Sequence, residues 1–184
     1  MASGYLTKFS RLIRMVLNNS KNPLINLEEE LEMLRLYIDL ERLRFNNTFD
    51  YSINFYNHFD ISSIFIPPLL LQPFAENAIW HGLMHKKDIG WLEIQLCTED
   101  KTLTCVIMDN GIGRKMSGSL NSRTANKNKS LGVEITSGRL ALLNKSKQEN
   151  AVFNIEDLFD EEGNGCGTKV TLTMPYKDLT EIDV

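Results

Sequence analysis

The sequence predicts an α+β fold in which helices cover one face of a mixed, mostly antiparallel sheet. Apolar residues recur at helical spacing over residues 5–45, whereas several segments after residue 48 alternate apolar and polar residues with a period of two. The strand patterns do not alternate regularly with helices, as they would in a doubly wound fold. We therefore expect a two-layer sandwich preceded by two amphipathic helices.

The first two expected elements are the amphipathic helices. In residues 5–17, apolar side chains share one stripe and basic side chains lie opposite. Turn-forming residues at 18–23 end this helix. A second helix is expected over residues 27–45, because Asn26 can cap it together with Glu29 and its acidic first turn suits the positive end of the helix dipole. Such a pair serves either as an interaction or dimerisation element or as a cover for its own domain, and the pattern favours neither.

The sheet and its helices are expected after residue 48. Five segments carry the alternation of half-buried strands, namely residues 49–55, 91–97, 103–108, 151–155 and 169–174. The second and third of these strands form a hairpin across a charged turn. Two helices are expected between strands, at residues 69–83, which follow two prolines, and at residues 131–143.

The composition limits the possible classes of function. The hydrophobic and charged fractions, 42% and 24%, are ordinary for a soluble globular protein, and a net charge of −4 gives no support for nucleic-acid binding. Cys97, Cys105 and Cys166 lack metal-ligand spacing, so we expect reduced thiols and a cytoplasmic location. The longest apolar run, residues 64–74, is broken by two prolines and is too short to span a bilayer.

The expected helix at residues 69–83 carries the first sign of a functional site. Gln72, Glu76, Asn77 and His81 lie in its middle, where a purely structural core helix more often has leucine or alanine. Four polar side chains in an apolar helix indicate a ligand-binding wall.

The second sign is the sequence DNGIG, which follows an expected strand. Asp109 is followed by Gly111 and Gly113, and residues without side chains let a ligand approach the backbone closely. The alternative is a simple hairpin turn, for which Asn-Gly is typical. The long polar segment at residues 114–130 favours a site, because such segments in compact domains are usually mobile functional lids or disordered insertions. Gly132 then stands at a helix start, where backbone N–H groups can receive phosphate.

The third sign is a glycine-rich turn expected at residues 163–168, directly before the last strand. Gly165, Gly167 and the hydroxyl of Thr168 can line a polar ligand, or the turn can simply join two strands. The sequence has no GxxxxGK[ST] motif, which excludes a P-loop, and it has no GxSxG, HExxH or protein-kinase HRD/DFG pair.

In this order, ENAIWHG, DNGIG, LGVEITSGRLALLN and GCGTKVTLTMP resemble the N, G1 and G2 boxes of the Bergerat-fold ATPases. LLLQPFAENAIWHGL and the preceding FSRLIRMVL and LEEELEMLRLYIDLERLRF resemble the LytS-type sensor histidine kinases, which pair with LytTR-type response regulators. The resemblance covers nearly the whole chain. It implies the end of a dimerisation and phosphotransfer element in residues 1–46, a Bergerat-type ATP-binding domain in residues 47–178, and a tail at residues 179–184.

The resemblance implies that the site binds ATP and Mg²⁺. Asn77 matches the asparagine that holds the Mg²⁺ bridging the nucleotide phosphates, and Glu76 matches an acid that orients water or metal or accepts a proton. Asp109 resembles the aspartate that accepts a hydrogen bond from the adenine amino group, with Gly111 and Gly113 shaping the pocket.

The same resemblance implies further contacts to the nucleotide. Residues near the phosphates are His81, Leu131, Gly132 and Val133, and residues beside the adenine are Gly165, Gly167 and Thr168. Two positions depart from the family pattern, because Ser130 replaces a common glycine and Ile135 replaces a common asparagine.

The phospho-accepting histidine of the family lies in a helix with the sequence PHF, and no such motif occurs here. His58, His81 and His85 are expected in or after a strand and around the nucleotide-site helix. We therefore expect a C-terminal cytoplasmic part of a membrane receptor that binds nucleotide but does not phosphorylate itself. The intact protein is expected to be a homodimer that transfers the γ-phosphoryl group of ATP to a histidine and then to a response regulator.

Two other functions remain open at this point. One is a Bergerat ATPase of another kind, such as a serine-directed anti-sigma kinase. The other is a nucleotide-binding scaffold without catalysis that works by dimerising. The two N-terminal helices favour the histidine kinase over the serine-directed kinase, which would not need them.

Overall fold

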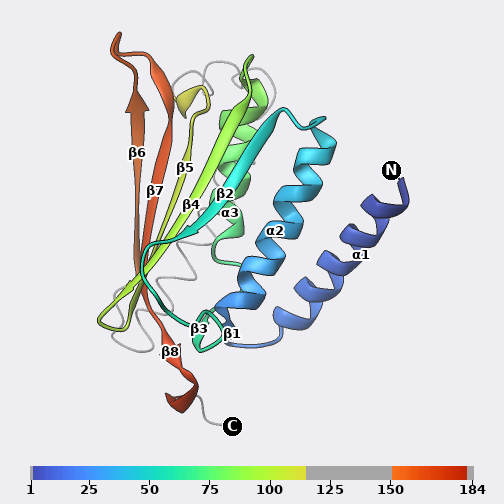
Figure 1. The fold of residues 1–184 in the computed structure, drawn as a ribbon, viewed down its shortest axis with the longest axis vertical. Helices are drawn as coiled ribbons and strands as arrows, with labels where there is room; N and C mark the ends of the chain where they lie inside the picture. Colours follow the sequence, from blue (N-terminus) through green and yellow to red (C-terminus); the bar gives the residue numbers. More distant parts are fainter. Residues whose placement is uncertain (1, 115–150, 182–184) are drawn as a thin grey trace. The chain divides into compact units, whose positions relative to one another are not determined.

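The structure is a computed structural model that describes residues 2–114 and 151–181 (Figure 1). Contacts divide the chain into two compact units. The first comprises residues 1–47, 58–72 and 176–184, and the second comprises residues 48–57 and 73–175.

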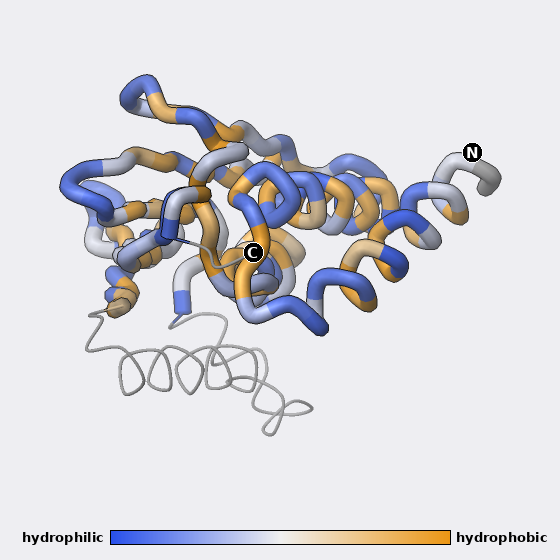
Figure 2. The backbone as a smooth tube through the Cα atoms, turned by 90° about the horizontal axis from the view of Figure 1, so that it is seen from below, coloured by the Kyte–Doolittle hydropathy of each residue, from blue (hydrophilic) through white to orange (hydrophobic). Residues whose placement is uncertain are grey.

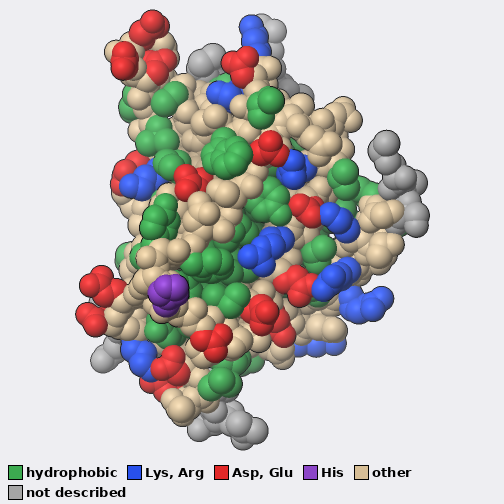
Figure 3. Space-filling view, viewed as in Figure 1, with side chains coloured by type: hydrophobic (Ala, Val, Ile, Leu, Met, Phe, Trp, Pro, Cys, Tyr) green, Lys and Arg blue, Asp and Glu red, His purple; other side chains and the backbone are tan. Residues whose placement is uncertain are grey.

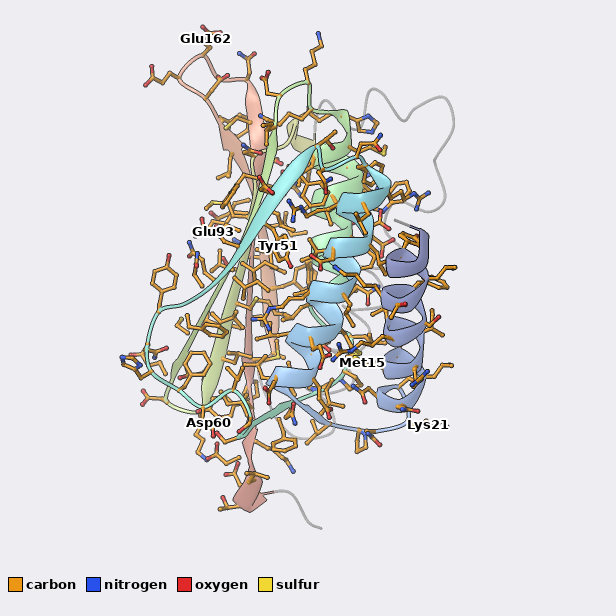
Figure 4. The ribbon with its side chains drawn as sticks, turned by 45° about the vertical axis from the view of Figure 1, so that its right-hand side comes forward. Met15, Lys21, Tyr51, Asp60, Glu93 and Glu162 are labelled. Atoms are coloured by element: carbon orange, nitrogen blue, oxygen red, sulfur yellow. The ribbon has the colours of Figure 1, made fainter. Side chains whose placement is uncertain are left out.

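The first unit contains a helical hairpin of α1 (Ala2–Asn19) and α2 (Leu27–Arg44), which run side by side in opposite directions (Figure 1). Hydrophobic and hydrophilic residues alternate along both helices (Figure 2), as the periodic pattern predicts. Ion pairs from Lys8 to Asp39 and from Arg11 to Glu32 join the helices. Their shared core consists of Leu12, Ile25, Met33, Leu36 and Leu40, with Met15, Val16, Tyr37 and Leu69 packed against it (Figure 4).

The start of α2 has the predicted cap. The side-chain oxygen of Asn26 accepts a hydrogen bond of 2.8 Å from the backbone N–H of Glu29. This bond satisfies one of the N–H groups that a helix leaves unpaired at its N-terminus.

A small antiparallel sheet completes the first unit. It has the order β1-β3-β8, from Ile25–Asn26, Ile64–Ile66 and Lys177–Asp178, and a short 3₁₀ helix, Leu179–Glu181, follows β8. Strands of two or three residues are too short to show a period in the sequence, which is why this sheet was not among the expected elements.

The second unit is built on a five-stranded sheet. Its order is β2 (Phe49–Phe55), β4 (Gly90–Glu99), β5 (Thr102–Asp109), β7 (Gly165–Pro175) and β6 (Val152–Phe159) (Figure 1). β2 runs parallel to β4, and each other pair of neighbours is antiparallel. The sheet is thus mixed and mostly antiparallel, as predicted.

One face of this sheet carries the core of the unit. Ile94, Ile107 and Val170 are buried and lie opposite one another in the registers of β4, β5 and β7. On the same face, the ring of Phe74 in the short helix α3 packs against the ring of Phe153 in β6, with 5.2 Å between centroids. Glu93, which lies between buried neighbours on β4, points to the opposite face (Figure 4). The predicted α+β layering is therefore present.

The helix predicted at residues 69–83 is shorter and less regular than expected. α3 spans Gln72–Asn77, a π-helical segment follows at Ala78–Gly82, and a 3₁₀ turn follows at Leu83–His85. The predicted start is wrong because Leu69 has a positive φ of 59°, which a right-handed helix cannot contain.

The glycine-rich turn predicted at residues 163–168 is also displaced. β7 already begins at Gly165, and the turn lies before it, where a side-chain oxygen of Asp160 accepts bonds from the N–H groups of Glu162 and Asn164, at 3.0 and 2.8 Å. Acidic side chains gather at this hairpin tip (Figure 3), which includes Glu162 (Figure 4).

Two other expected elements, the polar segment and the helix at residues 131–143, lie outside the described residues, apart from Arg114. Within residues 2–114 and 151–181, no helix has the length and apolarity needed to cross a membrane.

Candidate functional site

A buried carboxylate at the end of β5 forms the centre of the site. Asp109 is 2% exposed, and its register partner on β7 is Thr168. One carboxylate oxygen accepts a 2.8 Å hydrogen bond from the N–H of Gly111, and the other accepts a hydrogen bond from the hydroxyl of Thr168. Burial raises the pKa of Asp109, although these two donors and the charge of Lys86 act to lower it. The structure therefore holds a carboxylate, in a fixed orientation, where water is largely excluded.

Glycines let three chain segments approach Asp109. A Cβ atom on Gly82 would lie 2.6 Å from Oδ1 of Asp109, and one on Gly111 would lie 2.4 Å from the Cα of Gly82. A Cβ atom on Gly167, whose φ is +147°, would lie 2.0 Å from the carbonyl oxygen of Asp109. The end of the π segment, the DNGIG turn and the start of β7 thus meet around one carboxylate.

Gly82 was not among the residues predicted for the site. The sequence contains a usable signal, because an isolated glycine inside an otherwise helical pattern often has a packing or functional reason. Here the N–H of Ile112 donates a 3.3 Å hydrogen bond to the carbonyl oxygen of Gly82, which ties the π segment to the DNGIG turn.

The far end of the DNGIG turn is held by a different contact. Gly113 has a φ of +72°, and a Cβ atom there would lie 3.2 Å from the Cα of Gly165. The next residue, Arg114, donates two hydrogen bonds to the carboxylate of Asp157 on β6, at 2.6 and 3.0 Å. Asp157 is the register partner of Thr168, so the turn is fastened across the strand that carries the Thr168 hydroxyl.

Glu76 and Asn77 are the last two residues of α3. Phe74, Ala75 and Ala78 around them are buried, so Glu76 lies on the part of the helix that faces away from the core and Asn77 lies at the edge of the buried face. Asn77 is half-buried and Glu76 is exposed. Nearby atoms nevertheless shield the Glu76 carboxyl from water enough to raise its pKa. A carboxyl group with a raised pKa is suited to accept or hold a proton.

The π-helical segment begins directly after Asn77. The N–H of Leu83 donates to the carbonyl oxygen of Ala78, five residues earlier, as well as to that of Ile79. π turns are rare and often mark functional sites. The wide turn contacts β5 and β7 and carries the half-buried His81. Of the predicted site residues, Leu131, Gly132 and Val133 lie outside the described residues.

The sequence of this chain is similar to those of sensor histidine kinases. A family model described as histidine kinase matches residues 1–49. Sensor protein LytS of Oceanobacillus iheyensis is 28% identical over 183 residues, which is 98% of this chain and 30% of that protein. Sensor histidine kinase/phosphatase LytS of a Staphylococcus aureus strain has the same identity and coverage. The chain therefore spans about 30% of the length of these LytS proteins.

Two solved structures with a similar fold come from histidine kinases. The mycobacterial sensor histidine kinase MprB matches with a TM-score of 0.55 and 12% identity over 85% of this chain and 98% of that chain. The catalytic domain of histidine kinase ThkA matches with a TM-score of 0.54 and 12% identity over 84% of this chain and 97% of that chain. At this identity the likeness concerns the fold, and it confirms the predicted Bergerat-type sandwich. Along nearly its whole length, the chain is thus similar in sequence to the LytS sensor proteins.

Proposed function

We propose that this chain is the ATP-binding catalytic domain of a two-component sensor histidine kinase. The observation that carries the proposal is the buried carboxylate of Asp109, enclosed by glycine backbone. A carboxylate has about four lone-pair positions, and the bonds from Gly111 and Thr168 leave capacity for the amino group of an adenine. A neutral amino group also suits a buried acceptor better than a charged donor does, because moving a neutral group out of water costs less free energy.

The glycines around Asp109 fit the edge of a flat base. Gly111, Gly113, Gly165 and Gly167 present backbone atoms without side chains, which supports their assignment to the adenine pocket. We assign Thr168 to orient Asp109, through the hydroxyl that donates to its carboxylate.

Mg²⁺ is assigned to Asn77, whose side-chain oxygen is the kind of hard ligand that this ion prefers. Within the described parts of the chain, no group of three or more His, Cys, Asp or Glu side chains could hold a metal ion. We propose that phosphate oxygens and water supply other ligands of an ion at Asn77. When bound, Mg²⁺ neutralises charge on the phosphates during phosphoryl transfer. Glu76, one residue before Asn77, is assigned to orient water or to accept a proton, and its raised pKa supports the second role.

The remaining phosphate contacts are assigned to His81, Leu131, Gly132 and Val133. His81 lies on the π segment, one residue before the glycine that touches Asp109. The three others follow the polar segment, and a glycine there can offer backbone N–H groups to phosphate.

The acceptor of the phosphoryl group is proposed to lie outside these residues. The sequence has three histidines, and none of them is on α1 or α2. His58 is exposed after β2, His81 is in the π segment and His85 is in the 3₁₀ turn. We infer that this chain does not phosphorylate itself, and that the intact protein passes the group from histidine to a response regulator of the LytTR type. ATP is a cytoplasmic substrate, so we place the domain on the cytoplasmic side of the membrane.

We also propose that the intact protein is a homodimer held through α1. Five apolar residues of this helix are exposed, namely Tyr5, Leu6, Phe9, Ile13 and Leu17. From Leu6 onward they recur every three or four residues, and exposed apolar stripes of this kind usually mark an interaction surface.

Phosphoryl transfer in trans tests the proposed function. The chain is mixed with Mg²⁺, ATP labelled at the γ-phosphate, and a separate fragment that carries the upstream histidine helix of a LytS relative. We expect label on the fragment and none on this chain. Binding of Mg-ATP without any transfer would instead favour a non-catalytic scaffold, and label on a serine of an added substrate protein would favour a serine-directed kinase.

A further inference from the structure

A second buried carboxylate lies in the first unit, on α2. Glu30 is 1% exposed. Its Oε2 accepts a 2.7 Å hydrogen bond from the backbone N–H of Leu69, and its Oε1 accepts a 3.0 Å hydrogen bond from the N–H of Leu71. A buried carboxylate is costly unless donors compensate it, so both N–H groups are held tightly. Glu28, two residues earlier in the same helix turn, is exposed to solvent, as acidic residues of a first helix turn usually are.

The backbone that Glu30 holds is in a strained conformation. Leu69 has a φ of +59°, which is uncommon for a residue with a side chain. Such conformations persist where the surroundings enforce them, and they are frequent at functional and switch regions. The bond from Leu69 to Glu30 is one of the contacts that enforce it.

The segment before α3 is also joined to α2 at a second place. β3 ends at Ile66 and pairs with β1, in the registers Ile25 with Ile66 and Asn26 with Phe65. Asn26 is in turn the N-cap of α2. Residues 64–71 are therefore held at two places, by β1 directly before α2 and by Glu30 in its first turn.

This arrangement leads directly to the proposed metal ligand. α3 begins at Gln72, the residue after Leu71, and ends at Asn77. At the other side, ion pairs from Lys8 to Asp39 and from Arg11 to Glu32 fix α1 to α2. Glu30 therefore holds the two backbone N–H groups that directly precede the helix that carries Asn77.

We propose that Glu30 is a positioning residue that fixes the start of α3, the helix that ends at the metal-binding residue of the nucleotide site. It acts through the backbone of Leu69 and Leu71 and sets the position of Asn77, without touching the nucleotide. The inference rests on the proposed function of Asn77. Asp109 and its glycines belong to the adenine end, so the positioning role concerns the Mg²⁺-dependent part of nucleotide affinity.

The test compares Glu30→Gln with the wild-type chain and with the control Glu28→Gln, which makes the same chemical change at an exposed position of the same turn. An amide keeps one acceptor but turns an NH₂ group toward a backbone N–H, so one of the two bonds is lost. Calorimetric titration measures affinity for ATP with Mg²⁺ and for ATP with a chelator. We expect Glu30→Gln to lose roughly tenfold in Mg-ATP affinity, the lower end of what supporting partners contribute at metal sites. Its affinity for metal-free ATP and both affinities of Glu28→Gln should stay at the wild-type values.

Each other outcome overturns the positioning role. Wild-type Mg-ATP affinity in Glu30→Gln shows that the bonds from Leu69 and Leu71 to Glu30 do not position Asn77. An equal loss of ATP affinity with and without Mg²⁺ shows a general structural role. If Glu30→Gln does not fold, Glu30→Asp replaces it, because the shorter side chain keeps the charge but no longer reaches both N–H groups. The same selective loss is then expected, and its absence overturns the positioning role. A wild-type chain that binds no nucleotide under either condition overturns the proposed function itself.

Discussion

Gly82 and Gly111 approach each other so closely that a Cβ atom on Gly111 would lie 2.4 Å from the Cα of Gly82. The contact is between backbone atoms, so no rotation of a side chain can relieve an overlap there. It joins the end of the π segment to the turn after β5, and Oδ1 of Asp109 lies 2.7 Å from the same Cβ position. The shape of the proposed adenine pocket thus depends on two residues that lack side chains.

The substitution Gly111→Ala tests this dependence. We expect loss of ATP binding and a decrease of about 1–3 kcal/mol in the free energy of unfolding, as is typical of overpacking. Gly4→Ala on α1 is the matched control, because nothing lies within 4 Å of a Cβ atom there. Calorimetric titration and thermal unfolding measure the two effects. Wild-type affinity in Gly111→Ala would mean that the turn can move away from the π segment without consequence.

Acidification should weaken nucleotide binding through Asp109. Burial raises the pKa of this group in the folded state. A protonated carboxyl group presents fewer acceptor positions to the adenine amino group, so ATP affinity should fall as pH decreases through the raised pKa of Asp109. The stability of the protein without nucleotide should change in the opposite direction. A raised pKa of Asp109 contributes to the free energy of unfolding at low pH, and this contribution is lost as pH rises through the folded-state pKa. ATP titrations and unfolding measurements at several pH values, each compared with Asp109→Asn, isolate the two effects, and a variant with the same pH dependence as the wild type would contradict them.

Thr168 should shift this pH dependence in a known direction. Its hydroxyl donates to Asp109 and lowers the pKa of that carboxyl. Thr168→Val keeps the shape but removes the donor, so the pKa of Asp109 rises and the loss of affinity on acidification begins at a higher pH. The measurement is the same pH series of ATP titrations. An onset at the wild-type pH would show that the hydroxyl does not act on Asp109 in solution.

The ion pair between Arg114 and Asp157 should contribute modestly to stability. The geometry is bidentate, but the two side chains are 52% and 23% exposed. A double-mutant cycle with Arg114→Ala and Asp157→Ala is expected to give a coupling free energy of about 0.5–1 kcal/mol, which solvent screening keeps small. High salt should reduce it further. A coupling near zero at low salt would mean that the turn is held by its glycines alone.

Local patterns in the sequence predicted most of the second unit. The expected strand at residues 49–55 has the bounds of β2 because its alternation of apolar and polar residues is complete. The strands predicted at residues 151–155 and 169–174 are shorter than β6 and β7, since the glycines before Lys169 and the two consecutive acidic residues after Ile155 break the period in the sequence.

Features that depend on distant partners could not be predicted. The resemblance assigned Asp109 and Thr168 to the same site, but the hydrogen bond between them, across 59 positions in sequence, follows from no local pattern. The π turn brings Gly82 to the DNGIG turn, and this contact also arises only in the folded chain. Glu30 matched the helix dipole in the sequence, whereas its partners, Leu69 and Leu71, belong to a segment with no polar side chain to indicate them.

The apolar stripe of α1 predicts self-association. Leu6 and Ile13 are 62% and 42% exposed, and the ring of Tyr5 stacks on that of Phe9 with 6.4 Å between centroids. We expect sedimentation to show a dimer that Leu6→Glu and Ile13→Glu each convert toward monomer, because a charge in an apolar contact must be desolvated. Ser10→Glu, at an exposed polar position of the same helix, is the control. A wild-type chain that sediments as a monomer at all concentrations would contradict this use of the stripe.

Removal of the Asn77 side chain should distinguish the contribution of Mg²⁺ to ATP affinity from that of the adenine. Asn77→Ala deletes the oxygen assigned to Mg²⁺ but leaves Asp109 and its glycines unchanged, so affinity for ATP in the presence of Mg²⁺ should fall to the metal-free value. The half-buried position makes loss of the fold unexpected. Asn22→Ala, at an exposed asparagine in the turn after α1, is the matched control and should bind as the wild type does. Titrations with and without Mg²⁺ give the metal contribution as a difference, in which each factor of ten corresponds to about 1.4 kcal/mol. A variant that keeps the full difference would show that another group holds the ion, and the assignment of Asn77 would then be wrong while that of Asp109 could still hold.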